Sequence, residues 1–82
     1  MTGYTIQIGA FSEQANAKRT ADALVSRTAK LRIGTPRLVA SKNRFKQPVA
    51  LVQIGYYATF SAAKRARQTL GNAQAIIVPL SR

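Results

Sequence analysis

The sequence predicts an α+β fold of the ferredoxin-like (RNP-like) class, a two-layer βαββαβ sandwich with a four-stranded antiparallel sheet and two helices on one face. The first observation is an internal repeat: residues 6–24 (IQIGAFSEQANAKRTADAL) align without a gap with residues 52–70 (VQIGYYATFSAAKRARQTL). The second is that each strand-plus-helix unit is followed by a further strand pattern, over residues 37–41 and 75–80. Two split βαβ units with right-handed crossovers place the first and third strands side by side in the centre of one sheet.

The repeat matches polar as well as apolar positions. Gln7 aligns with Gln53, and the other identical pairs are Ile8 and Ile54, Gly9 and Gly55, Ala17 and Ala63, Lys18 and Lys64, Arg19 and Arg65, and Leu24 and Leu70. Convergence of two units through packing alone is the alternative, and it would explain the apolar matches. It does not explain a glutamine in the middle of both strands.

Composition indicates one small basic domain. We expect residues 4–82 to form a single domain with one core, after a short leader or cloning-derived start at residues 1–3. The 13 Lys and Arg residues against Glu13 and Asp22 give a formal net charge of +11, which favours an anionic partner. A merely solubilising surface is the alternative. No apolar run approaches the roughly 18 residues that a bilayer-spanning helix requires, so we expect no transmembrane segment in this chain.

The first strand is predicted over residues 4–9, where apolar and polar residues alternate. Thr5 and Gln7 should point away from the core, opposite Tyr4, Ile6 and Ile8, and Gly9 should end the strand. A helix then begins at Ser12 or Glu13 and ends at Gly34. Its buried stripe, spaced by four and three residues, is Ala17, Ala21, Leu24, Thr28 and Leu31.

The second half repeats this logic. Residues 37–41 form a strand, residues 42–48 (KNRFKQP) a basic hairpin loop, and residues 49–55 a strand that places Gln53 on the same face as Gln7. A helix capped by Thr59 or Ser61 ends at Gly71 and buries Ala63, Ala66 and Leu70. In the last strand, residues 75–80, Pro79 suits a sheet edge because proline lacks a backbone donor.

The residue types exclude most catalytic chemistry. The chain has no histidine and no cysteine, so it offers no familiar general base and no zinc ligand set. Glu13 and Asp22 are nine residues apart on one helix, about 13.5 Å of rise, whereas paired glycosidase carboxylates lie about 5 to 9.5 Å apart. The isolated glycines Gly9 and Gly55 make no phosphate-binding loop. We expect a binding domain that is not an enzyme and uses no metal or cofactor.

Two motifs carry a family resemblance. YTIQIGAF at residues 4–11 resembles the first motif of the SPOR domain, the sporulation-related repeat of bacterial cell-envelope proteins, in which an aromatic residue begins a strand ending in Gln-Val/Ile-Gly-Ala/Ser-Phe. VQIGYY at residues 52–57 takes the place of the second motif, Val-x-Val/Ile-Gly-Pro-Phe/Tyr. Here Tyr56 stands where the family usually has proline, and Gln53 where arginine or lysine is frequent. The likeness spans the whole chain.

The resemblance implies a domain that binds peptidoglycan, preferentially denuded glycan strands from which amidases have removed the stem peptides. It also implies that the domain brings a longer parent protein to the division septum, in the periplasm of the bacterial cell envelope, during cell division. By family analogy, Gln7, Ser12 and Gln53 lie on the glycan surface.

The residues themselves agree with a glycan ligand. Amide side chains pair with hydroxyl and acetamido groups, and the cations Arg37, Arg44 and Lys46 can address lactyl carboxylates. Phe45 or Tyr56 can pack on a sugar face. A packing role for each aromatic residue, and a solvated connector for residues 42–48, are the alternatives.

Nucleic-acid binding is the main alternative function, because a basic sheet of this class also describes RNA-recognition domains. Those domains carry stacking aromatic residues on the open face, worth about 1 to 3 kcal/mol per base. The equivalent positions here are Thr5, Gln7, Leu51 and Gln53. Non-specific attraction to phosphates does not depend on stacking, so nucleic-acid binding stays open as the alternative. A protein-interaction module is a third class.

Overall fold

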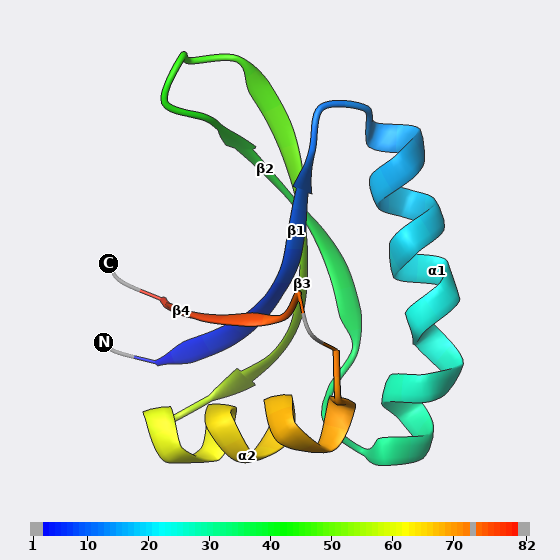
Figure 1. The fold of residues 1–82 in the computed structure, drawn as a ribbon, viewed down its shortest axis with the longest axis vertical. Helices are drawn as coiled ribbons and strands as arrows, with labels where there is room; N and C mark the ends of the chain where they lie inside the picture. Colours follow the sequence, from blue (N-terminus) through cyan, green and yellow to red (C-terminus); the bar gives the residue numbers. More distant parts are fainter. Residues whose placement is uncertain (1–2, 73, 81–82) are drawn as a thin grey trace.

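A computed structural model describes residues 3–72 and 74–80 and has the predicted βαββαβ order (Figure 1). The elements are β1 (Tyr4–Phe11), α1 (Gln14–Leu31), β2 (Pro36–Lys42), β3 (Pro48–Tyr57), α2 (Phe60–Leu70) and β4 (Ile76–Pro79). The strands form one antiparallel sheet in the order β2-β3-β1-β4. Figure 1 shows both helices on one side of a curved sheet, which leaves the other side free of helices. The predicted fold class is therefore confirmed. Residues 1–2 of the expected leader and residues 81–82 of the expected domain lie outside the described residues.

The core lies between the sheet and the two helices, and the predicted helical stripes supply it. From α1 and α2 the buried members are Ala17, Ala21, Thr28, Ala63, Ala66 and Leu70, while Leu24 and Leu31 are partly buried and pack against this core. The sheet contributes Ile6, Val52 and Ile54, none of which is exposed. Because alanines dominate the stripes, the helices can approach the strands closely.

The first strand is longer than predicted. Gly9 does not end β1, because it pairs with Val52 and the strand continues to Phe11. The glycine lies instead at a register shift between Gln7 and Gly9, where β1 holds one more residue than β3. Its φ is not positive, so the backbone stays extended and passes through the bulge without turning.

The start of α1 agrees with Glu13, one of the two predicted positions, whereas its end differs from the prediction. Glu13 occupies the N-cap and its side chain makes no capping bond, so Ser12 does not cap the helix. At the other end the left-handed C-cap is Arg32, with φ 58°. Gly34 has another role, because a Cβ at this position would lie 2.6 Å from the Cα of Gly55. Close approach of two backbones, and not helix capping, is what requires glycine at position 34.

The second half follows the prediction more closely. Thr59 caps α2, with its Oγ1 accepting a hydrogen bond from the Ala62 amide at 3.1 Å, and Gly71 is the left-handed C-cap. β4 is an edge strand with Pro79 at its end, as expected, but it is one residue shorter at each end than the predicted 75–80. In the described part of the chain, no helix combines the length and the apolar character needed to cross a membrane.

Candidate functional site

A row of four residues crosses the helix-free face of the sheet. Arg37 on β2 pairs with Gln53 on β3, Gln53 pairs with Gln7 on β1, and Gln7 pairs with Ile76 on β4. Directly paired residues point to the same face of a sheet, and the neighbouring core pair of Ile6 and Ile54 points to the helices. We call Arg37, Gln53, Gln7 and Ile76 the cross-strand row. It contains three of the residues that the sequence predicted for the glycan surface.

Side-chain hydrogen bonds link the polar members of the cross-strand row. Arg37 Nη2 donates to Gln53 Oε1 at 3.2 Å, and Gln53 Nε2 donates to Gln7 Oε1 at 3.3 Å. Gln53 is 8% exposed and Gln7 is half-buried. The row is thus a connected network that spans three strands.

Arg37 is held from several sides. Its Nη2 also donates to Thr5 Oγ1 at 3.1 Å, and its Nη1 donates to the Gly55 carbonyl at 3.2 Å. The Tyr56 ring packs over the guanidinium group, with its centroid 4.0 Å from Cζ, an arrangement that favours the cation. Tyr56 remains 70% exposed, so most of its ring is available to a ligand beside the row.

Thr5 is the residue of this face whose role the sequence did not reveal. The alternation placed it on the helix-free side, and we expected it to face solvent together with Gln7. Instead it is fully buried, because it lies beneath Arg37 and its hydroxyl group reaches the carbonyls of Ile54 and Gly55 at 3.1 and 2.7 Å. Its partner Arg37 is 32 positions away, so only strand pairing could identify the contact.

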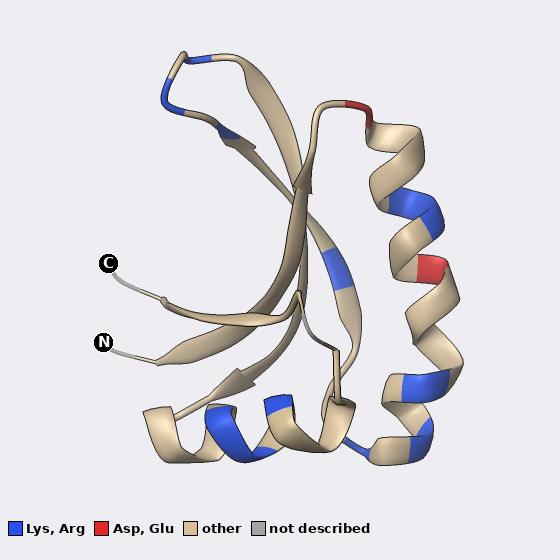
Figure 2. Cartoon of the chain, viewed as in Figure 1, with Lys and Arg blue, Asp and Glu red and all other residues tan. Residues whose placement is uncertain are grey.

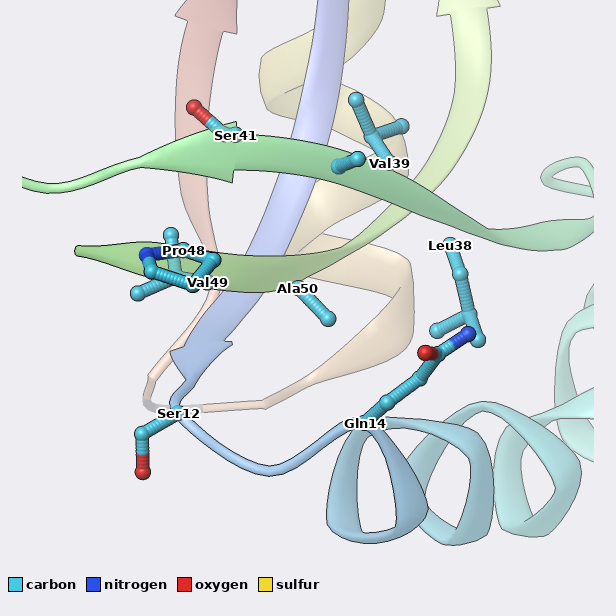
Figure 3. Close-up of a pocket in the computed structure, with 9 residues that line it drawn as sticks. Ser12, Gln14, Leu38, Val39, Ser41, Pro48, Val49 and Ala50 are labelled. Atoms are coloured by element: carbon cyan, nitrogen blue, oxygen red, sulfur yellow. The ribbon is translucent and has the colours of Figure 1, made fainter. Parts of the chain in front are cut away.

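Ser12 lies apart from the cross-strand row, in the connection between β1 and α1. It lines a pocket of about 340 Å³ between this connection and the β2–β3 hairpin. In Figure 3 Leu38 and Ala50 extend from the strands toward the start of α1 at Gln14, while the Ser12 hydroxyl group points away from the strands. The lining is mainly apolar, with Leu38, Val39, Ala40, Pro48, Val49 and Ala50.

Arg44, Phe45 and Lys46 form a third location, the exposed turn of the β2–β3 hairpin. Asn43 orders this turn, since its Oδ1 accepts from the backbone amides of Phe45 at 2.8 Å and Gln47 at 3.1 Å. Phe45 is 72% exposed. The five residue steps from Arg37 to the end of β2 cover about 17 Å, so the structure separates the turn from the cross-strand row.

Positive charge is spread beyond this face. Figure 2 shows Lys and Arg on both helices and at the hairpin turn, with the two acidic residues confined to α1 and the connection before it. Two helix arginines are engaged in the fold: Arg27 Nη2 donates to the Leu70 carbonyl at 2.7 Å, and Arg67 Nε donates to the Ala75 carbonyl at 2.6 Å. Part of the +11 charge therefore has a structural use.

The groups that meet at the site are amides, a hydroxyl group, an aromatic ring and a guanidinium cation. Among residues 3–72 and 74–80, no group of three or more His, Cys, Asp or Glu side chains gathers to hold a metal ion. The hydroxyl group of Tyr57 donates a hydrogen bond to the Ile33 carbonyl. Burial raises the pKa of this phenol, and the nearby Arg37 cation opposes the shift. What the face offers to a ligand is amide groups, an exposed aromatic ring and an ordered cation.

Comparison with known proteins supplies the family. No curated protein sequence matches the chain. The solved structures that it resembles include a crystal structure from Burkholderia pseudomallei K96243, of a protein described as exported, with 23% identity and a TM-score of 0.67 over 98% of this chain. The chain spans 16% of the length of that protein, and this likeness shows the fold alone.

A second solved structure has about the same length as this chain. It is the solution structure of the peptidoglycan binding domain of the B. subtilis cell wall lytic enzyme CwlC, with 27% identity and a TM-score of 0.58. The alignment covers 99% of this chain and 92% of that domain. The family model of the SPOR domain matches residues 1–79, nearly the entire sequence. The chain therefore belongs to the SPOR domain family.

Proposed function

We propose that this domain is a non-catalytic peptidoglycan-binding module whose helix-free face receives glycan strands, preferentially denuded ones. Membership of the SPOR family and the similarity to the CwlC domain support peptidoglycan as the ligand. The observation that carries the location is the cross-strand row, a hydrogen-bonded line of amide and guanidinium groups on the face that the helices leave open.

The ligand chemistry matches the face. A glycan strand without stem peptides exposes hydroxyl groups, acetamido groups and lactyl carboxylates. The half-buried amide of Gln7 can form hydrogen bonds with these hydroxyl, acetamido and carboxylate groups. The exposed ring of Tyr56, beside Arg37, offers a surface for a sugar ring. Stem peptides would hinder such a strand from lying flat across the sheet, which is why we propose a preference for denuded glycan.

The outlying residues extend the same proposal. Arg44, Phe45 and Lys46 project at the hairpin turn, where a long polymer crossing the sheet can reach them. Ser12 adjoins the apolar pocket and would contact a different part of the glycan strand from the part that lies on the cross-strand row. We assign the central affinity to Gln7, Gln53, Arg37 and Tyr56, and an electrostatic contribution to the turn.

We further propose that residues 4–82 act as a targeting domain of a longer bacterial envelope protein. Denuded glycan forms where amidases separate daughter cells, so the ligand preference would concentrate the parent protein at the periplasmic side of the division septum. This targeting proposal depends on the preference for denuded glycan, so a retention experiment with denuded and intact sacculi tests its premise.

The direct test is retention on sacculi. Purified domain should be retained on amidase-treated sacculi and much less on intact sacculi at the same mass of glycan. Equal retention on both would argue against the denuded-glycan preference. Equally tight binding to an unrelated polyanion at moderate salt would argue against glycan recognition altogether.

Nucleic acid is the alternative ligand, since the net charge is +11. Binding to nucleic acid should lose affinity linearly in log–log plots against salt, with a slope close to the number of phosphates neutralised. Glycan binding should keep a salt-resistant part, because hydrogen bonds and sugar packing are not screened. A salt titration with both ligands therefore distinguishes the two functions.

A further inference from the structure

We propose that Arg37 is a positioning residue that fixes which way the amides of Gln53 and Gln7 point, so that the cross-strand row presents an N–H donor to the ligand and selects an acceptor oxygen. This inference rests on the proposed function for the identity of the ligand. The geometry that supports it is the hydrogen-bond chain from Arg37 through Gln53 to Gln7.

The donor-to-acceptor direction of this hydrogen-bond chain follows from the chemistry of Arg37, where it begins. A guanidinium group only donates, whereas a glutamine amide has one accepting and one donating end. Because Arg37 Nη2 lies 3.2 Å from Gln53, the oxygen of that amide must face the arginine. Gln53 Nε2 then faces Gln7 and requires its oxygen, which turns Gln7 Nε2 outward. Without Arg37, both amides could turn over together at little cost.

Arg37 is itself fixed in place. Both hydrogens of Nη2 are used, by Gln53 and Thr5, and Nη1 donates to the Gly55 carbonyl. Tyr56 covers one side of the guanidinium plane. The side chain thus has little freedom to move toward a ligand, and its position is set before any ligand binds.

The hydrogen-bond chain ends at Gln7 Nε2, a donor that faces solvent. Gln7 Nε2 donates no hydrogen bond among residues 3–72 and 74–80, and no buried side-chain nitrogen or oxygen there lacks a partner. This amide end is therefore exposed on the helix-free face. Ile76, its neighbour in the row, is 51% exposed and offers no competing polar group. A hydroxyl group can pair with either end of an amide, so the ligand group that this donor selects is a carbonyl or carboxylate oxygen.

The decisive variant is Gln53→Glu. A carboxylate at position 53 still accepts from Arg37, and it forms an ion pair that helps to keep the fold, but it cannot donate to Gln7. Gln7 must then turn its Nε2 toward position 53 and present its oxygen to the ligand. We expect retention on amidase-treated sacculi to fall about tenfold or more, because one donor is lost and an oxygen meets an oxygen.

Side-chain amide NMR signals provide the readout that a merely structural role would not move. The Gln7 amide signals, identified by their absence in Gln7→Ala, should shift downfield and exchange more slowly with water in Gln53→Glu. Gln68→Glu, an identical charge change on α2, is the matched control and should leave both the Gln7 signals and retention unchanged. Thermal melts confirm that each variant is folded.

Two outcomes overturn the inference: wild-type retention by folded Gln53→Glu, or Gln7 amide signals that do not change. If the wild-type domain is not retained on denuded sacculi, the proposed function fails, and the NMR readout still tests the positioning role of Arg37. Glycan whose carboxylates have been reduced to alcohols identifies the acceptor. If Gln7 binds the lactyl carboxylate, Gln53→Glu and the wild-type domain should be retained equally on the reduced glycan. If Gln7 binds the acetamido carbonyl, Gln53→Glu should still be retained less than the wild-type domain.

Discussion

Gln53 Nε2 donates a hydrogen bond to Gln7 Oε1 at 3.3 Å, directly across the central pair of strands. The two residues hold the same position in the two repeated units, 46 residues apart. The centre of the sheet is thus also the meeting point of the two units, and a ligand on the helix-free face contacts both units there. One consequence is that the amide of Gln7 supports Gln53 as well as offering a group to the ligand.

Substitution of Gln7 should separate binding from stability. Gln7→Ala removes the acceptor of Gln53 Nε2 and the donor that faces the ligand, so we expect a loss of about 0.5–1.5 kcal/mol in stability and about tenfold weaker retention on denuded sacculi. Ile8→Ala is the contrasting variant, because Ile8 is 5% exposed and belongs to the core. It should cost about 2–5 kcal/mol. Thermal melts beside sacculus pull-downs measure both effects, and a Gln7→Ala domain that unfolds would contradict the assignment of Gln7 to the helix-free face.

Arg32→Gly should stabilise the domain. Arg32 is the C-cap of α1 in the left-handed region, φ 58° and ψ 40°, where a side chain is strained and glycine is not. We expect a gain of about 0.5–1 kcal/mol, or a rise of several degrees in Tm, since 1 kcal/mol is worth about 4–8 °C in a domain of this size. Arg19→Gly removes the same charge from the exposed interior of α1 and should instead destabilise by about 1 kcal/mol. Equal melting shifts in both variants would refute the strain at Arg32.

Gly34→Ala should be severely destabilising. The residue has φ +124°, and a Cβ there would lie 2.6 Å from the Cα and 3.0 Å from the amide nitrogen of Gly55, backbone atoms that cannot give way locally. We expect a loss of about 3 kcal/mol or more in urea unfolding. At Gly9, in contrast, a Cβ would make ordinary contact with the Phe11 ring at 3.4 Å and φ is not positive. Gly9→Ala should therefore cost less than about 1 kcal/mol, and a similar cost at both sites would exclude the backbone contact as the reason for Gly34.

Alkaline pH should weaken the fold through Tyr57. Burial raises the pKa of this phenol in the folded state, and the opposing effect of Arg37 is smaller, so the unfolded chain loses the proton first. The stability that the protonated phenol contributes is fully present below the unfolded pKa of about 10 and is lost as pH rises through the folded pKa. Tyr57→Phe lacks this pH dependence, and it also lacks the hydrogen bond to the Ile33 carbonyl. At pH 8 we therefore expect the variant to be less stable than the wild-type domain by about 0.5–1.5 kcal/mol. Urea unfolding between about pH 8 and 11 should show the two stabilities converging above pH 10, and parallel profiles would contradict the assignment.

Local patterns in the sequence determined the element order, the buried stripes of both helices and the shared face of Gln7 and Gln53. These follow from short periods: successive side chains of a strand alternate between faces, and helical residues three and four apart share one face. The cap at Thr59 and the stop at Gly71 are also local, because each depends on hydrogen bonds within one turn of α2. The sequence likewise named Arg37 and Tyr56 as site residues, although not the contact between them.

Tertiary structure alone decided which of the predicted site residues meet. Arg37 reaches Thr5 and Gln53 because β2 pairs with β3 in one particular register, and a shift of one residue would turn its side chain to the helices. The same long-range pairing brings Gly34 against Gly55 and separates Ser12 and the hairpin turn from the cross-strand row. Strand register depends on the packing of the whole sheet on its core, and the periodicity of a single segment carries no information about which residue of another segment it will face.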